Sequence, residues 1–202
     1  MQPYSLLPAQ GSEQHDEWIR LGTEAQLSGN FPKADSFYRS ALRISPNNTI
    51  AIHNLAILQA CTNNLNDALL SMEKAVLFEK KEPVMYANQA LICLEADRID
   101  EAVFAACNGM ALATSLPVPS SDPNHDQLKT AGYINARLAY AMVSASAGHP
   151  ENAYPAYMEM LAVDPKHAAA GPNSCFVTSL MPIGPKELIE PRKLWYMTNR
   201  VQ

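Results

Sequence analysis

A pattern of large and small side chains recurs every 34 residues along the first half of this chain. In its first copy, residues 15–48, Leu21 and Gly22 are followed by Ala34 and Tyr38. A shift of 34 residues keeps the slots in phase, since the same positions hold Leu55, Ala56, Ala68 and Met72. A repeat of about 20 to 50 residues is typical of stacked helical units, so the spacing favours an array over a single globular core.

Each copy is interpreted as two helices joined by a short turn. Apolar and small residues fall at helical spacing on both sides of residues 28–30 and of residues 63–64, which have turn composition. The third copy carries Gly109 inside a predicted helix, where we expect close helix packing because glycine otherwise weakens a helix. Backbones should also approach closely at the small slots Gly22, Ala56 and Ala90 of the first helices and Ala34, Ala68 and Ala102 of the second helices.

The period breaks at Leu116 and resumes later. Because three prolines follow within residues 117–123, we expect a loop over residues 117–127. Ala153 and Tyr157 then refill the slots of Ala34 and Tyr38 at an offset of 119 residues. The sequence thus predicts repeats 1–3 over residues 15–116, then a long helix from about Gln127 to Ala147 and a fourth repeat within residues 128–167.

The two ends of the chain lack the period. Residues 1–14 contain Pro3, Pro8 and Gly11 and lack signal-peptide composition, so they predict a flexible leader. Residues 168–202 include an apolar and basic stretch, PKELIEPRKLWYMTNRVQ. We expect this C-terminal segment to cap the exposed edge of the array or to join it to another domain.

The motif W-x2-L-G at Trp18, the A-x3-Y pair at Ala34 and Tyr38, and the closing Pro46 make the chain similar to the tetratricopeptide-repeat superfamily. This resemblance implies an all-α fold, a right-handed α-solenoid of about four helix-turn-helix repeats with a C-terminal capping helix. It also implies a concave groove, lined by the first helix of each repeat, that binds a protein or peptide.

Counting His15, Thr49, Pro83 and Ile134 as first positions of the repeats gives the candidate groove. Asn54 and Asn88 share its sixth position one repeat apart. An amide side chain offers one donor group and one acceptor, which suits the backbone of an extended peptide; the alternative is that both bond to neighbouring helices and hold no ligand. The candidate partner-binding residues are Arg20, Thr23, His53, Asn54, Ile57, Asn88, Leu91 and Glu95.

A narrower resemblance concerns the phrase N-L-A-I-L from Asn54 and the ending SCFVTSLMPIGPKELIEPRKLWY. Both are similar to the repeat region of SPINDLY and O-linked N-acetylglucosamine transferase-type proteins. That resemblance implies an asparagine ladder that holds acceptor polypeptides, and a helix with Arg192 and Trp195 that leads into a sugar-nucleotide-binding domain. Here Arg20 and Ala139 interrupt the ladder.

Composition narrows the function classes. Hydrophobic residues at 48% and charged residues at 17% are typical of a folded chain, and a net charge of −5 argues against nucleic acid or an anionic membrane as the partner. The sequence contains no recognisable catalytic, phosphate-binding or metal-ligand motif, so we expect no enzyme activity, cofactor or metal. We predict a cytoplasmic adaptor that binds a protein or peptide; the alternatives are the N-terminal recognition part of a glycosyltransferase and a scaffold that forms homo-oligomers through its repeat ends.

Overall fold

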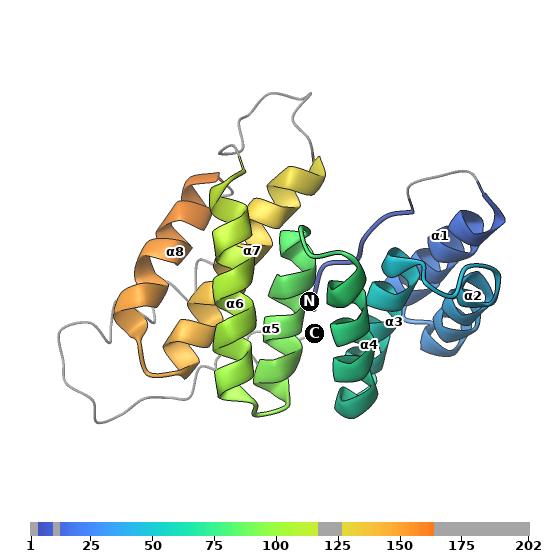
Figure 1. Cartoon of the computed structure of the whole chain (residues 1–202), viewed down its shortest axis with the longest axis horizontal. Coiled ribbons are helices and arrows are strands. Elements are labelled where there is room, and N and C mark those ends of the chain that lie inside the picture. Colours follow the sequence, from blue (N-terminus) through green and yellow to red (C-terminus); the bar gives the residue numbers. More distant parts are fainter. Residues whose placement is uncertain (1–3, 10–12, 117–126, 164–202) are drawn as a thin grey trace. The chain divides into compact units, whose positions relative to one another are not determined.

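The computed structural model describes residues 4–9, 13–116 and 127–163 of the 202-residue chain. Within these ranges it contains eight α-helices and no β-strand (Figure 1). Consecutive helices pack as four helix-turn-helix pairs. The helices are α1 (Gln14–Leu27), α2 (Phe31–Ile44), α3 (Thr49–Cys61), α4 (Leu65–Phe78), α5 (Pro83–Glu95), α6 (Ile99–Thr114), α7 (Gln127–Ser146) and α8 (Pro150–Val163).

The turn inside each pair contains one residue with left-handed backbone geometry. These residues are Gly29 (φ 78°), Asn63 (φ 62°), Asp97 (φ 64°) and Gly148 (φ 85°). Glycine adopts this conformation without strain, and asparagine and aspartate tolerate it better than other residues. The first three lie 34 residues apart, and Gly148 follows Gly29 by 119 residues, so the backbone repeats with the spacing that the side-chain pattern predicts.

Polar caps fix several of the helix starts. The side chain of Asn30 accepts a hydrogen bond from the backbone N–H of Lys33 at the start of α2, and Asn48 accepts one from Ala51 at the start of α3 (2.9 Å). These bonds satisfy backbone donors that have no partner within the first turn of a helix. Proline lies in the first turn of α2 and begins α5, where its missing N–H costs nothing.

The described residues form two compact units: residues 4–81 with α1–α4, and residues 82–163 with α5–α8. In the first unit Ala34 and Tyr38 form a core cluster with Ala25, Leu55 and Leu58. Ala34, Ala56 and Ala68 are fully buried, and Gly22 is buried against the ring of Tyr38. The small slots predicted for this unit therefore lie where helices meet.

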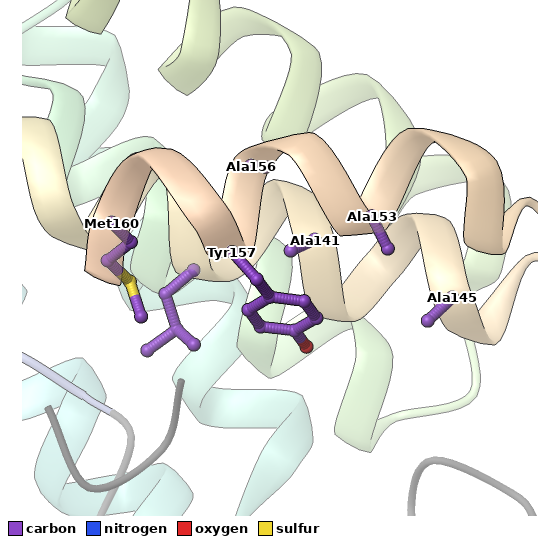
Figure 2. Packing of buried hydrophobic residues seen from close by; sticks show 7 residues of the cluster. Ala141, Ala145, Ala153, Ala156, Tyr157 and Met160 are labelled. Carbon is purple, nitrogen blue, oxygen red and sulfur yellow. The ribbon is translucent and has the colours of Figure 1, made fainter. Parts of the chain in front are cut away.

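In the second unit α7 packs against α5 and α6 as well as α8. Figure 2 shows small residues of α7 and α8 facing one another, with Tyr157 and Met160 filling the space beside them. A Cβ on Gly109 would lie 3.2 Å from Cβ of Tyr86, which confirms the close packing expected at this glycine. Ala90 and Ala102 are fully buried.

The helix expected before the fourth repeat spans Gln127–Ser146, 20 residues against 13 in α3 and α5. The side chain of Arg137 in α7 is buried, and its Nε donates to Oε2 of Glu159 in α8 (2.6 Å). Its Cζ lies 3.4 Å from the ring centroid of Tyr133. The predicted loop at residues 117–127, except its last residue, and the predicted C-terminal segment with Arg192 and Trp195 lie outside the described residues.

Candidate peptide-binding site

Residues 4–9, called the leader segment below, differ from the flexible leader that we expected over residues 1–14. Leu7 is only 3% exposed. Its backbone N–H donates to Oδ1 of Asn54 (2.9 Å), and Nδ2 of Asn54 donates to its carbonyl oxygen (2.8 Å). One amide side chain of α3 thus satisfies both backbone groups of a residue 47 positions away, which fixes the leader segment at this point.

Asn54 is fully buried and also contacts its neighbour His53. The bond from the N–H of Leu7 identifies the accepting atom of Asn54 as the oxygen Oδ1, and an amide oxygen can only accept. Nδ1 of His53, which lies 3.0 Å from Oδ1, is therefore the donor and carries the proton. Burial lowers the pKa of His53 to about 4, and the hydrogen bond to Asn54 partly opposes that shift. His53 is accordingly uncharged at neutral pH and supports the amide in the orientation that Leu7 requires.

The next two residues of the leader segment continue along the same unit. Pro8 is exposed, while Ala9 is half-buried and packs against a core cluster of Ile19, Ala41 and Ala51. Together with Leu7 this gives the alternation of buried and exposed side chains that an extended chain shows on a surface. An open hollow of about 510 Å³ adjoins this part of the segment and is lined by Pro8, Ala9, Glu13, Asp16, Glu17, Arg20, Thr23 and Glu24.

The surface that receives the leader segment, called the leader site below, consists of Asn54 and the cluster of Ile19, Ala41 and Ala51. Its polar part, the amide of Asn54, forms hydrogen bonds only with backbone groups of the bound segment. Its apolar part accepts a small side chain two residues further on. The arrangement can therefore hold an extended peptide chain.

Arg20 and Thr23 bond within their own repeat. The guanidinium of Arg20 is ion-paired with Glu17 (2.6 Å) and with Glu24, and these carboxylates raise its pKa. Thr23 donates from its hydroxyl to the backbone carbonyl of Ile19 (3.0 Å). Arg20 thus stands in the slot of Asn54 but forms its contacts along α1.

The remaining candidate residues divide between the two units. Ile57 is buried in the first unit. In the second unit Asn88 and Leu91 are buried and Glu95 is half-buried. Whether Asn54 and Asn88 serve one continuous ladder stays a prediction, since each unit is described by itself.

Sequence reasoning missed Leu7, which is the residue that Asn54 holds. A signal was available, because Tyr4, Leu6 and Leu7 place three large apolar side chains within four residues of a segment expected to be solvated. Sequence reasoning also missed the buried Arg137, for which periodicity gives no signal.

The described ranges offer no metal site, because within them no three histidine, cysteine, aspartate or glutamate side chains cluster in a way that could hold a metal ion. None of the helices described is both long and apolar enough to cross a membrane.

No protein-family model matches the sequence, and no curated protein matches it either. Solved structures do match. PilF of Pseudomonas aeruginosa has a TM-score of 0.68 at 17% identity over 91% of this chain and 71% of that one. TTC0263, a thermophilic TPR protein of Thermus thermophilus, has a TM-score of 0.66 at 16% identity over 83% of each chain.

An O-GlcNAc transferase of Thermobaculum terrenum also matches, with a TM-score of 0.58 at 16% identity over 75% of this chain and 27% of that one. Identities this low show the fold alone. The fold class predicted from the sequence, an all-α tetratricopeptide-repeat fold, is confirmed by these structures and by the helix pairs.

Proposed function

Because the chain has the tetratricopeptide-repeat fold, we propose that it is a protein-interaction module that holds an extended peptide at the leader site. The observation that supports this function is the pair of hydrogen bonds between the Asn54 amide and the backbone N–H and carbonyl of Leu7. Backbone groups are the same in every non-proline residue, so a partner's segment can make the same two bonds.

Burial makes this pair of bonds effective. Asn54 is fully buried, so an unfilled site removes two hydrogen bonds of its amide, those to Leu7, which only water could then replace. A hydrogen bond between a peptide and a buried amide contributes about 0.5 to 1.5 kcal/mol, and leaving one partner unsatisfied costs about 1 to 3 kcal/mol. The site thus favours occupancy by a chain in the extended conformation.

The fold class supports an interaction module more directly than it supports a glycosyltransferase. The likeness to the O-GlcNAc transferase rests on the fold, and this chain spans 27% of that protein. Recognition of acceptor polypeptides for such an enzyme would use the same backbone-holding amides, so it remains a second candidate that differs only in what the partner segment is attached to.

The test titrates a synthetic peptide of residues 1–12, MQPYSLLPAQGS, into the Leu7→Asp variant, whose own segment lacks the buried anchor. NMR chemical shifts should report binding at the amides of α3. Adding Asn54→Ala to the receptor, or methylating the Leu7 nitrogen of the peptide, should each weaken binding at least about tenfold, which corresponds to about 1.4 kcal/mol.

Asn135→Ala is the matched control, because the amide of Asn135 donates to the carbonyl of Ala131 in its own helix. This variant should bind the peptide as the unmodified receptor does. Failure of the peptide to bind at millimolar concentration, with the receptor fully helical by circular dichroism, would refute the proposed function.

A further inference from the structure

The leader segment occupies the site that the proposed function assigns to a partner. The backbone of Leu7 bonds both Oδ1 and Nδ2 of Asn54, and Ala9 packs against the neighbouring apolar cluster. Resting on that proposed function, we propose that residues 4–9 are a built-in competitor, which an extended partner segment of similar chemistry must displace before it can bind.

The same contacts define the class of partner segment. At the position of Leu7 the side chain is buried, so a large apolar residue is required there. The next position is exposed and accepts any side chain, and the position of Ala9 is half-buried against the cluster of Ile19, Ala41 and Ala51, where we expect a small residue. The partner is therefore an extended segment with a large apolar residue, a variable residue and a small residue in succession.

The short connection to α1 makes the competitor effective. Only residues 10–12 separate Ala9 from Glu13, the residue at which α1 is capped. A segment tethered by a short linker experiences an effective concentration on the order of millimolar. A free peptide of the same sequence with a dissociation constant of about 100 μM would then bind the wild-type chain about tenfold more weakly than a chain whose own segment is undocked.

The experiment compares three full-length proteins with one fluorescent probe, the synthetic peptide of residues 1–12. The proteins are the wild type, Leu7→Asp, which removes the buried anchor, and Asn135→Ala, a control outside both the leader segment and the leader site. We expect Leu7→Asp to bind the probe at least about tenfold more tightly than the wild type, and Asn135→Ala to bind it as the wild type does.

Specificity is tested with variants of the probe on the Leu7→Asp protein. Replacing Leu7 of the probe by Asp should abolish binding, whereas replacing Pro8 by Lys should leave binding unchanged within about twofold. Replacing Ala9 by Trp should weaken binding at least about fivefold, because the cluster accommodates a small side chain. Equal binding of all probes would overturn the assigned partner class.

The outcomes separate the competitor from the proposed function. Equal, measurable affinities of the wild type and Leu7→Asp would overturn the competitor while leaving peptide binding intact. Binding by neither protein would overturn both. A wild-type dimer that dissociates on Leu7→Asp, measured by sedimentation, would also overturn the competitor, because the leader segment would then occupy a second copy. Circular dichroism of each variant verifies that its helices are unchanged.

Discussion

A methyl group on Gly22 would lie 2.5 Å from Cε1 of Tyr38, closer than two non-bonded carbon atoms can approach. The ring has little room to move, since it is fully buried and its hydroxyl donates to Oε1 of Gln26 (3.0 Å). The fourth repeat fills the same two slots with Ala141 and Tyr157, and there the α7–α8 packing accommodates the extra methyl group (Figure 2).

We therefore expect Gly22→Ala to lower the free energy of unfolding by about 1 to 3 kcal/mol, although alanine is the better helix former. Urea denaturation monitored by circular dichroism measures this change. In a Tyr38→Leu background the same substitution should cost less than half as much, because the ring it meets is gone. An unchanged cost in that background would contradict the contact.

The backbone amide of Leu7 should exchange slowly with solvent, because it donates to a buried side chain. Asn54→Ala should accelerate its exchange at least about tenfold, equivalent to the loss of one hydrogen bond of about 1.4 kcal/mol. NMR-detected hydrogen exchange of the full chain measures this rate. Asn135→Ala should leave it unchanged, and rapid exchange of the Leu7 amide in the wild type would rule out the docked leader segment.

Stability should fall on mild acidification because of His53. Its pKa is about 4 in the folded chain against an ordinary value of 6.5, so the unfolded chain binds more protons between these values and is favoured as the pH falls through this window. Between pH 6.5 and pH 5 the loss should be about 1.5 kcal/mol.

His53→Gln should remove this dependence, even if the variant is less stable overall, whereas His149→Gln at an exposed position should retain it. Urea denaturation curves at several pH values give both slopes. A wild-type slope equal to that of His53→Gln over this window would show that His53 does not titrate in the way its burial requires.

Ala68 provides a test of the repeat register in α4. It is fully buried, so Ala68→Leu should destabilise the first unit by about 1 to 3 kcal/mol through overpacking. Glu73→Leu, at an exposed position of the same helix, is the control and should change stability by less than about 0.5 kcal/mol. Unchanged thermal unfolding of Ala68→Leu would refute the assignment of this slot.

The sequence by itself determined the repeat register. The 34-residue spacing, the turn residues Gly29 and Asn63 and the buried slots Ala34 and Ala68 all follow from local rules, since helix periodicity and backbone preference depend on residues close in sequence. For the same reason the 119-residue offset to the fourth repeat reappears in the backbone at Gly148.

Only the tertiary structure decided what the inward side chains contact. Periodicity placed Asn54 on the inner side of its helix but did not reveal that it holds Leu7, 47 residues away, because a hydrogen bond depends on which chain segment is brought near in space. Likewise the 119-residue offset pairs Gly22 with Ala141, but periodicity did not reveal that the ring of Tyr38 leaves no room for a methyl group at Gly22.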